Sequence, residues 1–140
     1  MNLADKISNA ELEVMKILWR EQSFVSFSDI RSELQEVKGW EKSTINTLVR
    51  RLVEKGVISA EKHGVMQYKP NISEAEYKLA EEQNLINKLY NGSAKNLVAA
   101  LCHRGELTEA DIDELKTYFR MGGNHDNQLS VKLVFKSHFK

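Results

Sequence analysis

Apolar residues recur at helical spacing in three runs along the first half of the chain. The first run, residues 10–19, follows the segment Ser8-Asn9-Ala10-Glu11, which has the spacing of a helix capping box. The second run, residues 27–37, follows Ser26 and is ended by Lys38-Gly39, and the third occupies residues 45–53. The inward face predicted for the third helix consists of Ile45, Leu48, Val49, Leu52 and Val53.

After the third run the period of the pattern changes to that of extended backbone. Gly56 ends the helix, and two short segments, residues 57–62 and 65–69, flank His63-Gly64. Glycine readily takes the positive φ that a tight turn requires. We therefore predict a β-hairpin that ends at Pro70.

Three further helices are predicted in the second half of the chain. Ser73 opens a long helix that ends at Gly92 and whose apolar face includes Leu79, and a second helix carries residues 97–101. The third begins at Thr108 and is closed by Gly122-Gly123. Their apolar faces must be buried against something, either within one chain or against a second copy.

Three short helices followed by a hairpin are typical of the winged helix-turn-helix, whose third helix fits the major groove of DNA. The predicted fold class is mainly α with a small β-hairpin. We expect a winged helix-turn-helix domain over residues 1–71, a helical domain over 72–123 and a tail over 124–140. The tail alternates in part between apolar and polar residues, which fits a single strand or a disordered segment equally well, and no function is assigned to it.

Charge is distributed unevenly, although twenty basic residues balance twenty acidic ones. Residues 42–69 contain six basic residues against two acidic, whereas residues 71–123 contain six against nine. The first region therefore suits a polyanion such as DNA, and the second does not.

The outer side of the predicted third helix carries polar and basic residues. Asn pairs with adenine, hydroxyl groups reach bases or phosphates, and Arg or Lys neutralises phosphate or reads guanine. The candidates on this side are Lys42, Ser43, Asn46, Thr47, Arg50 and Arg51, and the positive charge continues into the hairpin at Lys62, His63 and Lys69. Tyr68 is expected to pack under the hairpin first and to contact phosphate second.

An isolated trio such as Arg50, Arg51 and Lys55 is usually a solvated helix flank. Here its continuity with the hairpin favours a DNA-binding surface. A winged-helix adaptor that binds proteins and not DNA is the alternative.

The sequence offers little for catalysis or metal binding. The four histidines are scattered, and the single cysteine, Cys102, excludes an intramolecular disulfide and a cysteine-rich zinc site. No phosphate-binding loop, signal peptide or membrane-spanning run is found. We therefore expect a cytoplasmic protein that is not an enzyme, has no cofactor and has no membrane partner.

Cys102 is expected to be a buried, small apolar side chain. The second interpretation is a redox role, in which oxidation near a symmetry mate perturbs a dimer.

Several segments together resemble one known family. They are Ala10-Glu11-Leu12-Glu13-Val14-Met15, Ile17-Leu18-Trp19, Trp40, Thr44-Ile45-Asn46-Thr47-Leu48, Arg51-Leu52, Lys55-Gly56, Lys88-Leu89-Tyr90-Asn91-Gly92-Ser93 and Asn96-Leu97-Val98. Over residues 7–122 the chain resembles the penicillinase and methicillin-resistance repressors, a family that also includes copper-responsive repressors.

The resemblance implies a homodimeric transcriptional repressor that binds a palindromic, inverted-repeat operator in double-stranded DNA until an unknown signal releases it. The implied operator contacts are Ser43, Thr44, Asn46 and Thr47, with Arg50 or Arg51 and Lys62 toward phosphate. The implied dimerisation residues are Leu85, Ile86, Leu89, Tyr90, Leu97, Val98, Leu101, Ile112, Leu115 and Phe119.

The sequence departs from the family pattern at several positions. Ser43 stands where members often have a basic residue, and Val65 directly follows the hairpin glycine where members commonly have Arg. Ala100-Leu101 replaces the Asn-Phe bond that β-lactam-responsive members have at their cleavage site, so release by that cleavage is not expected. No cysteine follows Gly122, which excludes copper sensing through paired thiolates.

Overall fold

The computed structural model describes residues 2–121, and packing divides the chain into a unit of residues 1–89 and a second unit that begins at Tyr90. In the first unit a short 3-10 helix η1 (Leu3–Lys6) precedes α1 (Asn9–Glu21), β1 (Val25–Ser26), α2 (Phe27–Lys38), α3 (Lys42–Glu54), β2 (Ile58–His63), β3 (Val65–Pro70) and α4 (Glu74–Tyr90). The second unit contains α5 (Ala94–His103) and α6 (Glu109–Met121). Predictions for residues 124–140 lie outside the described part of the chain.

The predicted helix boundaries are confirmed by the capping groups. The backbone amide of Glu11 donates to the Ser8 hydroxyl, and the amide of Ser8 donates to the Glu11 carboxylate, which completes the capping box of α1. Ser26 accepts from the amide of Asp29 at the start of α2, and Gly39 ends this helix with a φ of 68°. These local hydrogen bonds fix where α1 and α2 begin and where α2 ends.

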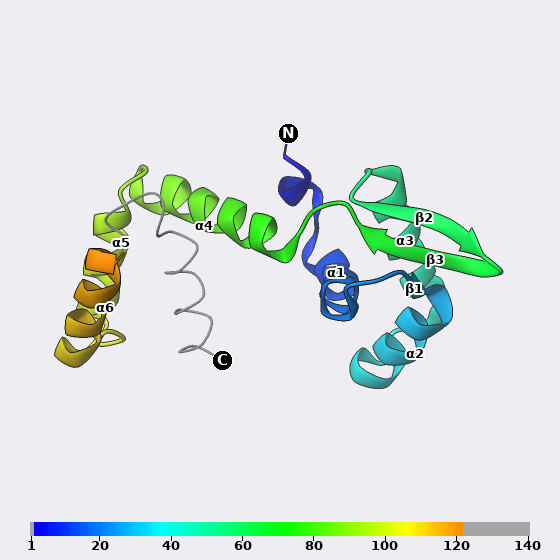
Figure 1. Ribbon diagram of the computed structural model, residues 1–140, viewed down its shortest axis with the longest axis horizontal. Helices are drawn as coiled ribbons and strands as arrows, with labels where there is room; N and C mark the ends of the chain where they lie inside the picture. Colours follow the sequence, from blue (N-terminus) through cyan, green and yellow to red (C-terminus); the bar gives the residue numbers. More distant parts are fainter. Residues whose placement is uncertain (1, 122–140) are drawn as a thin grey trace. The chain divides into compact units, whose positions relative to one another are not determined.

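The predicted hairpin is the main part of a small antiparallel sheet. β2 pairs with β3 through a turn at Gly64, whose φ is 77°. The two residues of β1 add a third strand on the other side of β3, so the order is β1-β3-β2. In Figure 1 the helices α1, α2 and α3 gather beside this sheet, an arrangement that makes the first unit a winged helix-turn-helix.

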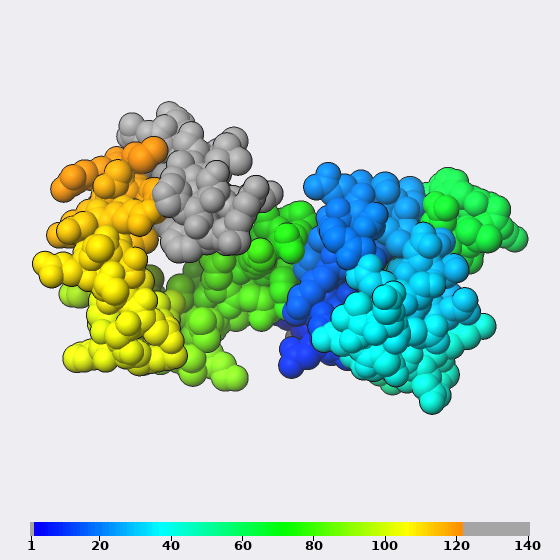
Figure 2. Space-filling view, turned by 90° about the horizontal axis from the view of Figure 1, so that it is seen from below, coloured from blue at the N-terminus to red at the C-terminus, as the bar shows by residue number. Residues whose placement is uncertain are grey.

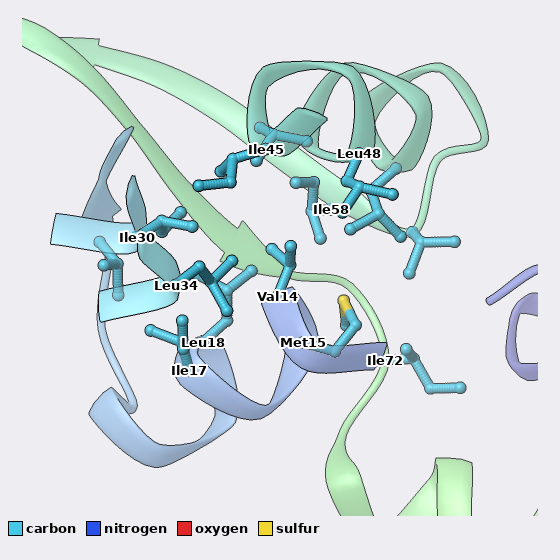
Figure 3. Packing of buried hydrophobic residues seen from close by; sticks show 14 of the residues in the cluster. Val14, Met15, Ile17, Leu18, Ile30, Leu34, Ile45, Leu48, Ile58 and Ile72 are labelled. Atoms are coloured by element: carbon cyan, nitrogen blue, oxygen red, sulfur yellow. The ribbon is translucent and has the colours of Figure 1, made fainter. Parts of the chain in front are cut away.

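One apolar core joins α1, α2, α3 and the sheet. Figure 3 shows side chains from all four elements pointing toward one another. The fully buried members include Val14, Leu18, Ile30, Ile45 and Ile58. Each buried aliphatic side chain of this size contributes about 1.5–3 kcal/mol relative to exposure. This core holds α3 by one face and leaves the other face in solvent.

Two apolar positions depart from the predicted stripes. Val37, at the end of the α2 stripe, is 68% exposed, and α2 ends one residue later. Leu79, on the predicted apolar face of α4, is 60% exposed. Within the described residues no side chain of α4 or α5 is buried, so the single chain does not bury the apolar faces predicted for these helices.

The domain boundary predicted after residue 71 divides the DNA-binding region from the helical region, and this functional division stays a prediction. Packing alone places most of α4 with the winged helix. Over the part of the chain described here, we find no helix long and apolar enough to cross a membrane.

Candidate nucleic-acid interface

Helix α3 has two chemically distinct faces. Ile45, Leu48, Val49 and Leu52 are buried, and they alternate at helical spacing with the polar candidates. Of the seven predicted contact residues on α3, six are exposed and one, Thr47, is half-buried. The exposed six are Lys42, Ser43, Thr44, Asn46, Arg50 and Arg51. The structure therefore brings them together on one side of one helix.

The first turn of α3 is suited to bind a hydrogen-bond acceptor that belongs to another molecule. Glu41 occupies the N-cap position but makes no side-chain capping hydrogen bond, unlike Ser8 of α1 and Ser26 of α2. The first turn contains no acidic residue and begins with Lys42. Free helix amides and a nearby ammonium group favour an anion such as phosphate.

Thr47 makes a hydrogen bond within α3. Its Oγ1 donates to the backbone carbonyl of Ser43 at 3.0 Å. This bond fixes the rotamer of the half-buried Thr47 side chain. It uses the hydroxyl hydrogen, so the hydroxyl oxygen can still accept a hydrogen bond through its lone pairs.

The wing, formed by β2 and β3, adds a basic side chain and exposed apolar side chains to the candidate DNA-binding surface. Lys62 is exposed on β2, and in Figure 2 the tip of the wing, in green, projects past α1 and α2. At the turn, Val65 is 60% exposed and Met66 is 41% exposed. The ammonium of Lys69 lies 5.2 Å from the centre of the ring of Phe24, the residue before β1, which is a cation–π contact.

An open hollow lies between α3 and the wing. Its volume is about 290 Å³, and its lining residues are Asn46, Val49, Arg50, Val53, Glu54, Ala60, Met66 and Tyr68. Two predicted contacts, Asn46 and Arg50, thus line the same hollow as Met66 and Tyr68 of the wing. Tyr68 is half-buried, in agreement with its predicted structural role. Lys62 does not line this hollow.

Lys55 is not part of this surface, contrary to the interpretation of the basic trio as one DNA-facing group. Its Nζ lies 2.7 and 2.8 Å from the two carboxylate oxygens of Glu11 and donates to the carbonyl of Lys6 at 2.9 Å. Glu11 is 1% exposed. The ion pair occupies Lys55 and attaches the end of α3 to the start of α1.

The sequence pattern predicts the role of Glu11 in the capping box but not its ion pair with Lys55. The two residues are 44 positions apart, and no spacing rule connects them. Burial acts to raise the pKa of Glu11, but hydrogen bonds from Lys55 and Ser8 and the charge of Lys55 outweigh it, so the pKa lies below its ordinary value of 4.5. Glu11 is therefore ionised in the folded chain at neutral pH.

The predicted dimerisation residues are largely accessible in the single chain. Phe119 is 82% exposed, and Leu85, Leu89 and Val98 are exposed to smaller extents. The remaining members are half-buried: Ile86, Tyr90, Leu97, Leu101, Ile112 and Leu115. Sequence reasoning did not single out Tyr118, which is buried and donates to Glu114 at 2.9 Å.

Cys102 is exposed, so its expected burial is wrong for the single chain. Ala100 and Leu101, the pair that the family resemblance singled out, both lie within α5. The described residues contain no group of three or more His, Cys, Asp or Glu side chains arranged to hold a metal ion.

Comparison with known proteins identifies the family. A family model described as penicillinase repressor matches residues 7–120. The penicillinase repressor of Bacillus licheniformis is 34% identical over 116 residues, which cover 82% of this chain and 90% of the relative. The methicillin resistance regulatory protein MecI of Staphylococcus aureus (strain N315) is 36% identical over 116 residues, which cover 82% and 94%.

Two solved structures are also similar. The DNA-binding domain of the repressor BlaI in solution is 40% identical and covers 55% of this chain and 94% of that chain, with a TM-score of 0.48. The monomeric form of Bacillus licheniformis BlaI in complex with the blaP half-operator is 42% identical and covers 51% and 87%, with a TM-score of 0.46. From the extent of the family match and of the curated relatives, the chain belongs to the penicillinase repressor family.

Proposed function

We propose that this chain is a transcriptional repressor that binds an inverted-repeat operator as a homodimer and is released from it by a signal. The observation that carries the proposal is the division of α3 into a buried apolar face and an exposed polar, basic face beside the wing. The relatives are themselves named as repressors or as a resistance regulator, which supports the same function.

In the proposed complex α3 lies in the major groove. Asn46 reads base edges, together with the hydroxyl side chains Ser43, Thr44 and Thr47. Lys42, Arg50, Arg51 and Lys62 neutralise phosphates. The exposed apolar side chains from α4 to α6, within residues 72–123, bind a second copy. Two copies related by a two-fold axis then match the symmetry of an inverted repeat.

The salt dependence of DNA binding tests the proposed DNA face. The probe is the set of duplexes that the unmodified chain selects from a random-sequence pool. Arg50→Ala combined with Arg51→Ala should lower the slope of log K against log salt by about 1.8 per protomer, because each lost phosphate contact removes about 0.9. The matched control is Arg104→Ala combined with Arg120→Ala, which removes the same charge from α6 and the turn after α5.

The outcomes separate the two candidate functions. An unchanged slope in the α3 variant would show that the DNA face is misplaced. If the unmodified chain selects no duplex even at low salt, the repressor proposal fails and the protein-binding adaptor takes its place.

A further inference from the structure

The start of α4 is docked on α1. The indole Nε1 of Trp19 donates to the carbonyl of Ile72 at 2.9 Å, and the rings of Trp19 and Tyr77 lie 5.3 Å apart between centroids. Ile72 is buried in the core of the winged helix. The residues on both sides of the start of α4 are therefore held by one aromatic side chain of α1.

A second attachment lies further along α4. The Nδ2 of Asn84 donates to the Oδ1 of Asp5 at 2.7 Å. Asp5 belongs to η1, which is anchored in the core by Ala4 and receives the Lys55 hydrogen bond at the carbonyl of Lys6. The N-terminal segment thus contacts both the end of α3 and the side of α4.

Two separate attachments constrain a helix more than one does. Tyr77 and Asn84 are seven residues apart, which corresponds to about 10 Å along the helix axis. A single contact would let α4 swing about that point, whereas two contacts at this separation fix its direction relative to α3. Each contact alone is modest, since an exposed hydrogen bond contributes about 0.5–1.5 kcal/mol.

We propose that Trp19 with Tyr77, and Asp5 with Asn84, are positioning pairs that make α4 a rigid arm of the DNA-reading unit and thereby set the half-site spacing that the dimer selects. This inference rests on the proposed function. If the dimer forms through residues from α4 onward, the direction of α4 determines where the second α3 meets the DNA. One inserted base pair turns the half-sites by about 34° relative to each other, so a rigid arm discriminates between spacings.

The test measures binding across a spacing series. The probe is the inverted repeat that the unmodified chain selects from a random-sequence pool, with base pairs added or removed at its centre. A duplex that holds one half-site reports separately on the DNA-reading unit. The test variant combines Tyr77→Ala with Asn84→Ala, and the control is Lys78→Ala, whose exposed side chain lies beside Tyr77 on the same helix.

In the double variant we expect the preference for the selected spacing over its one-base-pair neighbours to fall about threefold or more, because a flexible linkage tolerates a range of spans. Affinity for the single half-site should stay within about twofold of the unmodified chain. Lys78→Ala should keep the full preference, and Tyr77→Phe, which retains the ring contact, should keep it too.

Three results would overturn the inference. One is an unchanged spacing preference in the double variant. Another is a parallel loss of half-site affinity, which would show that the pairs support the fold and do not set the spacing. The third is that the unmodified chain selects no inverted repeat, and this result alone would also reject the proposed function.

Discussion

The ammonium of Lys55 is shared between both carboxylate oxygens of Glu11 and the carbonyl of Lys6. The pair connects the first turn of α1 to the C-cap of α3, the helix that carries the proposed DNA face. The Lys55 side chain is 35% exposed and that of Glu11 is 2% exposed, so the acid is the more costly partner to leave alone.

Replacing either partner of this pair should destabilise the winged helix. Glu11→Gln keeps the shape of the side chain but leaves Lys55 without its counter-charge, and we expect a loss of about 2–3 kcal/mol, below the range for a fully buried pair. Urea unfolding monitored by circular dichroism measures it. Glu36→Gln, an exposed carboxylate on α2, is the control and should change stability by less than about 0.5 kcal/mol.

Combining Glu11→Gln with Lys55→Met should cost less than the sum of the two single variants, because the double variant leaves no unpaired charge. Additive losses would show that the two side chains do not interact in solution.

The lowered pKa of the Glu11 carboxyl also determines how the free energy of unfolding changes at acidic pH. Its pKa in the folded chain lies below the ordinary value of 4.5, so the unfolded chain takes up the proton first as pH falls. The stability that Glu11 contributes is fully present above pH 4.5 and is lost as pH falls through the folded-state pKa. The difference in unfolding free energy between the unmodified chain and Glu11→Gln should therefore be constant above pH 4.5 and shrink as pH falls below it, through the folded-state pKa. A difference that stays constant with pH would contradict the assignment.

Asn46 and Arg51 should affect DNA binding in different ways. Asn46→Ala should reduce discrimination between the selected duplex and a scrambled one by about 1–3 kcal/mol and leave the salt slope unchanged, because it removes a base contact. Arg51→Ala should weaken both duplexes alike and lower the slope by about 0.9. Titrations of both duplexes at several salt concentrations distinguish the two patterns. If Asn46→Ala weakened both duplexes equally, Asn46 would be a backbone contact.

The wing turn depends on the backbone of Gly64. Its φ is 77°, and a Cβ built there would meet nothing within 4 Å, so an added side chain is opposed by backbone strain alone. Gly64→Ala should cost about 1–2 kcal/mol in unfolding free energy. Gly64→Asn should recover part of this loss, since Asn tolerates the left-handed region. Equal losses for Ala and Asn would point to a different cause.

Phe119 tests the proposed dimer. The side chain is 82% exposed in the single chain, so Phe119→Asp should leave the fold of the protomer intact and shift sedimentation at about micromolar concentration from a dimeric to a monomeric mass. Thr117→Asp adds the same charge to α6 two residues away and serves as the control. A monomeric mass for the unmodified chain would reject the dimer itself.

Local chemistry explains which parts of the fold could be predicted. Ser8, Ser26, Gly39 and Gly64 act through contacts with their own neighbours, so the helix starts and the hairpin turn were readable from short segments. The two residues of β1 could not be predicted, because so short a strand shows no alternation and forms only by pairing with β3.

The candidate site was predicted only in part for a similar reason. The exposure of Asn46 and Arg50 follows from the period of α3, whereas the ion pair of Lys55 depends on a partner distant in sequence. Helical spacing likewise cannot tell whether a neighbour covers an apolar stripe, and both Val37 and Leu79 are exposed in the single chain.

The hydrogen bond from Thr47 to the Ser43 carbonyl restricts what Thr47 can recognise. While the bond is kept, the hydroxyl hydrogen is committed, and the oxygen can only accept a hydrogen bond. Phosphate oxygens, guanine N7 and guanine O6 are acceptors, so Thr47 cannot pair with them. The exocyclic amino groups of adenine and cytosine are donors, and the thymine methyl group can pack against the threonine methyl group. In the proposed complex, Thr47 would therefore favour bases that present an amino or a methyl group in the major groove over guanine.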